Sequence, residues 1–478
     1  MKYFYETEIS SLANCINGRF IASVGKNKRT LVDKIGRVYD FECYSIRPVP
    51  EGCFIVQEDS RWIETLIDKF GNVICSGCRD IDFFSEDGIA VIKKLDGSKR
   101  WITKQGQEFG EQFKDIGPFS CGYGCVKLDD GSWTYVDTNL EPIGVSFTGV
   151  YSFTFDCDYS YVVIKNKYYV IDKNFQIQSG PYDDIMWINE YNIVAVKKNK
   201  PKDDKCVYAY YKIDGTQIGE DYKMIHDFVN GVSRVDTDEG YIFIDLEGKQ
   251  IGNRAFKTAR NFGENMAVVG EFDENGEHTY TFIRRDGSLF SQWYPAIGDE
   301  TEGLGSVMIG NKYYYIDVNE KTYGKGHKSL GLFHDGVADF YYKKGKYKYL
   351  TRDLKPFNEE FDNTRCFSEG FGVVRDNGVI DAVNKNQLRL SQISRIAQKV
   401  EENPKFVLDL PKEILSDREI TFLLYEHASM VLEQALECVD FDNGQKTEFV
   451  NLRNKLGTMM KEIEKDVPVY VPKEFFGV

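Results

Sequence analysis

The chain has 478 residues, of which 42% are hydrophobic and 14% aromatic, and its formal net charge is −15. This composition excludes an intrinsically disordered protein, because it supplies ample apolar material for a folded core. The negative charge argues against a nucleic-acid partner, since phosphate backbones are bound by a basic stripe.

The amino-terminal residues Met1–Glu8 lack the apolar segment of a signal peptide and contain early acidic side chains. No apolar run approaches the roughly 20 residues that span a bilayer. Eleven cysteines, an odd number spread along the chain, are more typical of a reducing compartment than of a disulfide framework. We therefore expect a cytoplasmic protein with no membrane contact.

One short pattern recurs from residue 18 to about residue 385. Its first mark is two apolar residues followed by Asp or a substitute, and often by a later Gly, as in Leu66-Ile67-Asp68 with Gly71. A fixed period of about 35 residues, repeated about eleven times, is the signature of a repeat architecture. The Asp position of this mark is occupied by Asp33, Asp68, Thr103, Asp137, Asp172, Lys212, Asp245, Arg284, Asp317, Thr351 and Asp381.

A second mark lies upstream of the first in each unit. It is Gly or Asn, an apolar residue, a small residue, any residue and a β-branched one, as in Gly370–Val374. The period of 2 predicts a strand with one buried face, and the small third residue suggests that another backbone passes close by. Turn signals such as Asp96-Gly97 then join the second mark to the first.

A third mark, an aromatic residue followed by polar residues and Ile, completes the unit, as in Tyr182–Ile185. Each unit is therefore predicted to be a small antiparallel sheet of three short strands, and stacked units would share a continuous core. The Asp of the first mark precedes a tight turn, in which its carboxylate can bond a backbone N–H two or three residues on. We interpret these aspartates as structural rather than catalytic.

These marks resemble the unit of the bacterial WG-repeat family, which reads approximately Phe-x-x-Gly-x-Ala-x-Val, then Lys-Trp-Gly-Tyr-Ile-Asp, then x-x-Gly, then an aromatic residue and Asp. The Trp-Gly dipeptide itself is absent: the Trp slot keeps an aromatic residue, as at Trp133 and Tyr241, and the Gly slot holds others, as at Thr134 and Ile242. The resemblance implies a repeat array that binds or scaffolds other molecules, and it implies no catalytic residues. The best copies run from Phe84 to Gly106, Phe119 to Pro142, Phe228 to Gly248 and Phe333 to Thr351.

Two units are longer than the others between their second and first marks. The extra residues are basic in Lys197–Lys205 and acidic in Glu271–His278. We expect both to be hairpin extensions on the rim of the array, where insertions often serve binding. A solvated loop tip without a partner is the alternative.

Beyond residue 386 the hydrophobic period changes from 2 to 3.6, which predicts helices. A first helical segment begins around Leu388 and ends near Pro404. A longer helix, capped by Ser416 or Asp417, is predicted to stop at residues 442–444.

A further helix runs from Phe449 to Ile463 and ends before Pro468. The two long helices should form an antiparallel hairpin that either caps the final repeat or docks a partner. The apolar, proline-broken stretch Val467–Val478 is predicted to be an extended tail that docks on the chain or on a partner.

The sequence offers little catalytic or metal-binding chemistry. Cys75 and Cys78, with Cys121 and Cys125, could supply four zinc thiolates, but Cys78 stands in the aromatic slot of the third mark, as Cys43 does one unit earlier. We therefore interpret these two cysteines as small core residues.

The remaining candidates are equally weak. Asp440–Gly444 resembles a calcium loop, but its Gly comes one place early for an EF-hand. The chain has no nucleophile elbow, Walker A loop or dinucleotide fingerprint. We predict no catalytic, cofactor-binding or metal-binding residue. The histidines, which show no metal-binding spacing, are His226, His278, His327, His334 and His427.

The predicted fold is mainly β. Residues 1–385 form an array of about eleven three-stranded antiparallel repeats, either open and curved or superhelical, or closed and propeller-like, and residues 386–478 form an α-helical region. The predicted function is a non-enzymatic scaffold, suited to a larger assembly, that binds a protein partner through the two rim loops or the carboxy-terminal tail. The alternative is a glycan- or small-ligand-binding array, suggested by 30 Tyr and 33 Phe, and an enzyme with a site built from rim loops is a third hypothesis.

Overall fold

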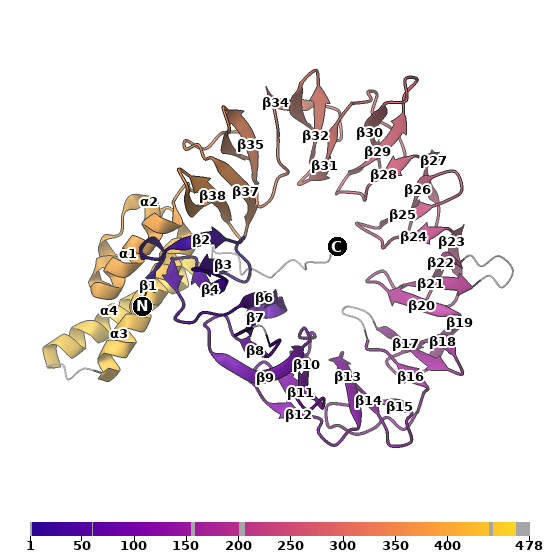
Figure 1. The fold of residues 1–478 in the computed structure, drawn as a ribbon, viewed down its shortest axis with the longest axis horizontal. Coiled ribbons are helices and arrows are strands. Elements are labelled where there is room, and N and C mark those ends of the chain that lie inside the picture. The colour runs from indigo at the N-terminus through magenta and orange to yellow at the C-terminus, as the bar shows by residue number, and fades with distance from the viewer. Residues whose placement is uncertain (1, 60, 154–157, 200–205, 439–442, 465–478) are drawn as a thin grey trace. The chain divides into compact units, whose positions relative to one another are not determined.

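The computed structural model describes residues 2–59, 61–153, 158–199, 206–438 and 443–464 (Figure 1). The chain is mainly β and ends in helices, as predicted. It divides into two compact units: unit 1 contains Met1–Val73 and Phe333–Val478, and unit 2 contains Ile74–Leu332. In both units, short strands pair antiparallel in small sheets, mostly with their neighbours in the chain.

Unit 1 contains the first and last parts of the repeat array. Its strands are β1 (Lys2–Tyr3), β2 (Ile9–Leu12), β3 (Arg19–Val24), β4 (Lys28–Asp33), β5 (Arg37–Val38), β6 (Ser45–Val49), β7 (Cys53–Gln57), β8 (Glu64–Ile67), β35 (Val337–Lys343), β36 (Lys346–Thr351), β37 (Asn363–Ser368), β38 (Phe371–Asp376) and β39 (Val379–Asn384), with short 3₁₀ turns η1 (Phe4–Glu6) and η2 (Pro50–Gly52).

Unit 2 contains the middle of the array. Its strands are β9 (Val73–Ile81), which starts at the boundary, β10 (Ile89–Lys94), β11 (Lys99–Thr103), β12 (Glu108–Phe109), β13 (Asp115–Ser120), β14 (Tyr123–Lys127), β15 (Trp133–Val136), β16 (Gly149–Val150), β17 (Tyr159–Ile164), β18 (Lys167–Asp172), β19 (Ile177–Tyr182), β20 (Asp184–Ile188), β21 (Ile193–Asn199), β22 (Cys206–Lys212), β23 (Gln217–Tyr222), β24 (Met224–Ile225), β25 (Val232–Asp236), β26 (Tyr241–Asp245), β27 (Gln250–Phe256), β28 (Thr258–Ala259), β29 (Met266–Phe272), β30 (His278–Arg284), β31 (Ile297–Thr301), β32 (Leu304–Ile309), β33 (Lys312–Ile316) and β34 (Thr322–His327).

The second mark forms a strand, as predicted, and the first mark forms the end of its partner strand. The expectation of a single buried face is wrong, because the consecutive residues Val232 and Ser233 are both buried. In one copy, β25 pairs with β26 so that Val232 lies opposite Asp245 and Val235 lies opposite Ile242. The small third residue is needed for a different reason from the one predicted. A Cβ added at Gly124 would lie 2.6 Å from the ring of Trp101, so a side chain of the preceding repeat, not a backbone, occupies the space.

The structural role predicted for the repeat Asp is confirmed. Asp137 Oδ1 accepts hydrogen bonds from the backbone N–H of Asn139 at 2.9 Å and of Glu141 at 3.0 Å. The carboxylate thus reaches residues two and four places on, which closes the turn before the next strand. The same pair of bonds is formed at Asp33, Asp68, Asp172, Asp245 and Asp317.

The last repeat corrects one prediction, because Asp381 is not its turn residue. Asn384 takes that place, with Oδ1 accepting from the N–H of Asn386 at 3.0 Å and of Leu388 at 2.9 Å. Asp381 instead accepts from the backbone N–H and hydroxyl of Ser391 at 3.1 and 2.5 Å. Val379-Ile380-Asp381 has the form of the first mark, but the true copy of that mark is Ala382-Val383-Asn384, in which Asn replaces Asp.

Within unit 1, the first repeat packs against the last. The Glu369 carboxylate accepts hydrogen bonds from the N–H groups of Asn17 at 2.8 Å and Gly18 at 2.6 Å. The rings of Phe20 and Phe371 meet edge to face at 5.5 Å. The two ends of the array are therefore neighbours in unit 1.

The same kind of bond joins successive repeats. Asp335 stands at the position equivalent to Glu369, directly before the Gly of the second mark, and its Oδ2 accepts from the N–H of Gly370 at 2.9 Å. In unit 2, Asp87 Oδ2 accepts from the N–H of Gly122 at 2.8 Å. The first repeat therefore contacts the last one through the contact that ordinarily joins one repeat to the next.

The carboxy-terminal helices are largely those predicted. The first helix ends before Pro404, and Asp417 Oδ1 caps the longer helix by accepting from Ile420 N–H at 3.1 Å. That helix ends at Cys438, before the predicted stop, and Asn443 already begins the last helix. The helical elements are α1 (Leu390–Glu402), η3 (Pro404–Asp409), α2 (Lys412–Leu415), α3 (Arg418–Cys438) and α4 (Asn443–Glu464).

The helices share one hydrophobic core with the first and last repeats of unit 1. Ile393 and Leu424 are fully buried in the same cluster as Phe20 and Phe371, and α1 lies beside β1 and β39 (Figure 1). The predicted tail and the predicted calcium-like segment fall on residues 465–478 and 439–442, which lie outside the described residues. No helix in the described part of the chain is long and apolar enough to cross a membrane.

Candidate functional site

The basic rim extension is a hairpin, as predicted. Strands β21 and β22 pair from Ile193 opposite Lys212 to Asn199 opposite Cys206. Of the predicted binding loop Lys197–Lys205, the first three residues belong to β21, whereas residues 200–205 lie outside the described ones.

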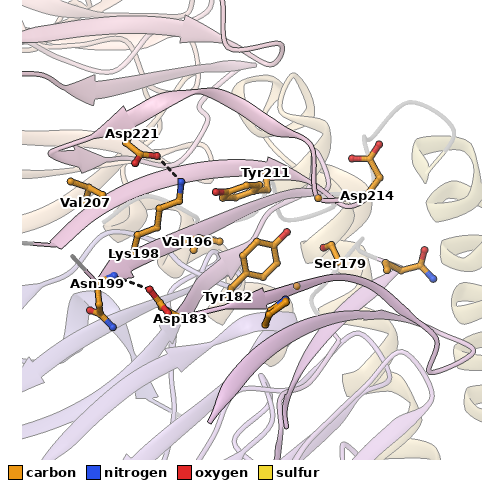
Figure 2. Close-up of a pocket in the computed structure, with 14 residues that line it drawn as sticks. Ser179, Tyr182, Asp183, Val196, Lys198, Asn199, Val207, Tyr211, Asp214 and Asp221 are labelled. Carbon is orange, nitrogen blue, oxygen red and sulfur yellow. Dashed lines mark hydrogen bonds and ion pairs between the residues drawn. The ribbon is translucent and has the colours of Figure 1, made fainter. Parts of the chain in front are cut away.

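A pocket of about 720 Å³ lies at this hairpin, within unit 2 (Figure 2). Residues of β19, β21, β22 and β23 line it, together with the turn that follows β22. The pocket therefore lies between two successive sheets of the array and takes side chains from both.

The charged side chains of the pocket are paired with one another or with the backbone. Lys198 Nζ lies 2.6 Å from Asp221 Oδ1 and 5.1 Å from the centre of the Tyr211 ring. Asp183 Oδ2 accepts from the N–H of Asn199 at 3.0 Å (Figure 2). Hydrogen bonds, first of all that of the Lys167 ammonium, lower the pKa of Asp183.

Two hydroxyl groups of the pocket residues are unsatisfied. The side chains of Ser179 and Tyr182 are 9% and 8% exposed, and neither oxygen has a hydrogen-bond partner within the described residues. Burial raises the pKa of Tyr182. Because buried polar groups are normally hydrogen-bonded, these two hydroxyls are the groups here that would gain most from a polar ligand.

Two aromatic rings and a turn complete the lining of the pocket. The Tyr182 and Tyr211 rings lie 5.1 Å apart and form an aromatic wall. Asp214 accepts from the N–H of Thr216 at 2.8 Å and so serves its own turn. The carboxylates and the ammonium of the described pocket residues therefore already have partners.

The acidic rim extension is a second hairpin. Strands β29 and β30 pair as far as Phe272 opposite His278, and Asp273 closes the turn by accepting from the N–H groups of Asn275 and Glu277 at 2.8 Å. The His278 ring packs edge to face on Phe272 at 4.5 Å.

The tip of this hairpin exposes an apolar group among acids. The Phe272 side chain is 59% exposed, and Glu274 and Glu277 are exposed beside it. At the base of the hairpin, Arg254 pairs with Glu271 at 2.8 Å. The exposed acids at the tip are therefore available to a partner, whereas the acid at the base is not.

The four cysteines considered for zinc do not form one cluster: Cys75 and Cys78 lie together in β9, and Cys121 and Cys125 have other neighbours. Cys78 is fully buried and Cys43 is 3% exposed, which confirms the prediction that both fill core slots. Cys125 packs among aromatic and aliphatic side chains, and Cys121 contacts Glu86. Among the described residues, no group of three or more His, Cys, Asp or Glu side chains is placed to hold a metal ion.

The sequence did not reveal the pocket. Its residues come from two successive repeats, and Ser179 and Lys198 belong to no mark of the repeat. One signal was available, since Tyr182 and Tyr211 are repeat aromatics that flank the basic insertion in the sequence.

Comparison with known proteins gives no family for this chain. No family model matches it, and no curated protein matches it. Among solved structures, a eukaryotic initiation factor is similar at 10% identity and a TM-score of 0.37, covering 60% of this chain and 87% of that one.

Two further solved structures show a similar degree of likeness. The extracellular domain of a hybrid two-component system from B. thetaiotaomicron is 10% identical, with a TM-score of 0.23 and coverage of 78% of this chain and 62% of that one. The dihydro-heme d1 dehydrogenase NirN in complex with DHE is 11% identical, with a TM-score of 0.28 and coverage of 59% and 74%. At these values the likeness assigns no function to this chain.

Proposed function

We propose that the protein is a non-enzymatic β-repeat scaffold that binds a protein partner through the tip of the β29–β30 hairpin. The observation that carries the proposal is Phe272, which is 59% exposed at that tip. Aromatic side chains, including Phe, are enriched in the buried cores of protein interfaces. Burying such a ring in a partner's pocket would contribute about 1.5–3 kcal/mol.

The charges around Phe272 specify the chemistry of the partner. Glu274 and Glu277 are exposed on the same turn, and the whole chain carries a net charge of −15. Complementary charge chiefly speeds encounter and excludes wrong partners. The proposed partner therefore presents an apolar pocket surrounded by basic side chains.

The proposed scaffold is an array of about eleven repeats of the WG-repeat type. Strands β6–β8 and β9–β12 each count as one repeat in this proposal. Support comes from the recurring Asp turn and from the bonds between repeats formed by Asp87 and Asp335. Bonds of this kind between repeats would hold the inserted hairpins in place, as a scaffold in a larger assembly requires. A cytoplasmic location is part of the proposal.

The proposal is tested by recovering partners from the native host with a Phe272→Ser variant. A matched control is Leu95→Ser, because Leu95 is 51% exposed in a hairpin turn of another repeat. We expect quantitative mass spectrometry to show that a partner bound by the wild type and by Leu95→Ser is lost from Phe272→Ser. Equal recovery of every partner by all three proteins would refute the assignment to this hairpin.

A second candidate function is the binding of a small polyhydroxylated ligand, such as a glycan, in the β19–β23 pocket. The unpartnered hydroxyls of Ser179 and Tyr182 favour it, and the Tyr211 ring offers an apolar surface for a sugar. A glycan array with the wild type and Tyr211→Ala tests this candidate. Binding that disappears in the variant supports it, and no binding by the wild type refutes it.

A further inference from the structure

Strand β9 has an unusual burial pattern. Cys75, Cys78 and Ile81 are buried, and the residues between them are more exposed. A regular strand buries every second residue, whereas this one buries every third. Two thiols that would point to opposite faces of a regular strand therefore share one face.

The backbone explains this pattern. Lys93 of β10 pairs with Asp80, but the next residue, Lys94, pairs with Cys78, so Arg79 is an extra residue in a β-bulge. Gly77 has a φ of +70°, a conformation that Gly adopts without strain. Together these two features bring the Sγ atoms of Cys75 and Cys78 to 4.0 Å.

The repeat provides the space for this contact. Cys78 stands in the slot that holds Tyr222 in a later repeat, and Cys75 stands where that repeat has Gly219. A Cβ added at Gly219 would lie 2.3 Å from the Tyr222 hydroxyl, so in that repeat the end of the ring fills the space. In β9 two sulfur atoms share the volume that one ring occupies elsewhere, which places them in contact.

A basic residue, Lys94, stands opposite Cys78 in the pairing of β10 with β9. Burial alone would lower the pKa of Lys94, but its hydrogen bond with Glu108 and the neighbouring charges of Glu108, Cys78 and Cys75 raise it, so the side chain stays cationic. A nearby positive charge favours the thiolate, which is the form that attacks a disulfide. Cys75 is 8% exposed and Cys78 is fully buried, so Cys75 is the thiol that a reagent reaches first.

We propose that Cys75 and Cys78 are a reversible redox pair, oxidised to an intramolecular disulfide by thiol–disulfide exchange with a low-molecular-weight disulfide such as oxidised glutathione. The Cys75 thiolate attacks one sulfur of oxidised glutathione, which forms a mixed disulfide and releases one glutathione thiolate. Cys78 then attacks the Cys75 sulfur and displaces the second glutathione. Two electrons pass from the cysteines to glutathione, and the two protons of the cysteine thiols end on the released glutathiones.

Little movement separates the reduced pair from the product. A disulfide requires the two sulfurs to approach to about 2.05 Å, from the 4.0 Å at which they lie. The residues enclosed by the new bond are Ser76 and Gly77, and the Gly lets the backbone adjust. Oxidation would fix the bulge of β9, and a reducing agent would release it.

The experiment uses the full chain without denaturant. Wild type is equilibrated with an excess of oxidised glutathione, quenched with acid, unfolded and labelled with N-ethylmaleimide, and its peptides are weighed. We expect the peptide with Cys75 and Cys78 to be unlabelled, lighter by two hydrogens, and fully labelled after dithiothreitol. In the Cys78→Ser variant we expect Cys75 to retain a glutathione adduct, because the second displacement cannot occur.

Cys366 supplies an internal control, since it is exposed and should react with glutathione in every sample. If Cys366 is modified while both thiols of β9 remain labelled in the wild type, the redox pair is excluded. A disulfide from either thiol to a different cysteine would also overturn the proposal. Circular dichroism of each variant, compared with the wild type, shows that the tested protein is folded, and Cys75→Ser should form no disulfide at this site.

Discussion

Replacing Glu369 by Ala should loosen the contact between the first and last repeats of unit 1. The carboxylate accepts two backbone hydrogen bonds, from Asn17 at 2.8 Å and Gly18 at 2.6 Å. Hydrogen bonds to a charged group contribute about 1.5–3 kcal/mol each. Because Glu369 is only partly buried, the lower end applies, and we expect the variant to lose about 2–3 kcal/mol of stability.

This loss is large enough to measure by thermal unfolding. For a folding unit of about 150–250 residues, 1 kcal/mol shifts Tm by about 2–4 °C, so Tm should fall by about 5–10 °C. Hydrogen exchange should rise in β2 and β3 more than in the strands of unit 2, because these strands belong to the repeat that Glu369 holds.

A matched control separates this contact from a general effect of removing an acid. Glu360 pairs with Lys343 at 3.4 Å on the surface of unit 1, and such pairs contribute at most about 1 kcal/mol. We expect Glu360→Ala to behave like the wild type. If Glu369→Ala also keeps the wild-type Tm and the wild-type exchange of β3, then Glu369 does not hold the two ends together.

Three further outcomes follow from the contacts described above. Asp137→Ala should lower thermal stability by about 0.5–2 kcal/mol, because two N–H groups lose their acceptor; unchanged stability with loss of binding would instead make Asp137 functional. Burial, and to a lesser extent the charge of Arg37, lowers the pKa of His427 to about 4. The stability that the protein gains from keeping His427 neutral is therefore complete above about pH 6.5 and is lost as the pH falls towards 4. Urea unfolding at pH 5 should therefore show a loss of about 2 kcal/mol relative to neutral pH that is absent in His427→Gln, and an equal loss in both proteins would contradict this cause. Removing residues 386–478 uncovers the core shared with the first and last repeats, and light scattering should show self-association, whereas a stable monomer would contradict the capping role.

The sequence predicts the role of a residue correctly where that role depends only on residues of the same repeat. The turn at Asp137 depends on the next four residues alone, and a strand follows Gly370 as its apolar residues predict. The helix cap at Asp417 is equally local. Cys78 was placed correctly because the register of the repeat assigns it to a core slot.

The same reasoning failed where the role depends on another repeat. Nothing in the local pattern says that Glu369 will meet Asn17, some 350 residues earlier in the chain. The pocket at Lys198 was missed because it arises between two sheets. The prediction for Asp381 is wrong because an apolar pair precedes it as in the first mark, whereas the turn residue of this repeat is Asn384.

The acidic residues at the repeat positions described above form structural hydrogen bonds. Asp137 and its equivalents close turns, and Asp87, Asp335 and Glu369 bond the backbone of the next repeat. A carboxylate with two or three backbone donors is held in place and is not available to a substrate. The proposed binding therefore rests on an insertion, the hairpin tip at Phe272, where an aromatic ring and acidic side chains are exposed together. Substitutions in the insertions should therefore change binding, whereas substitutions within the marks should change stability.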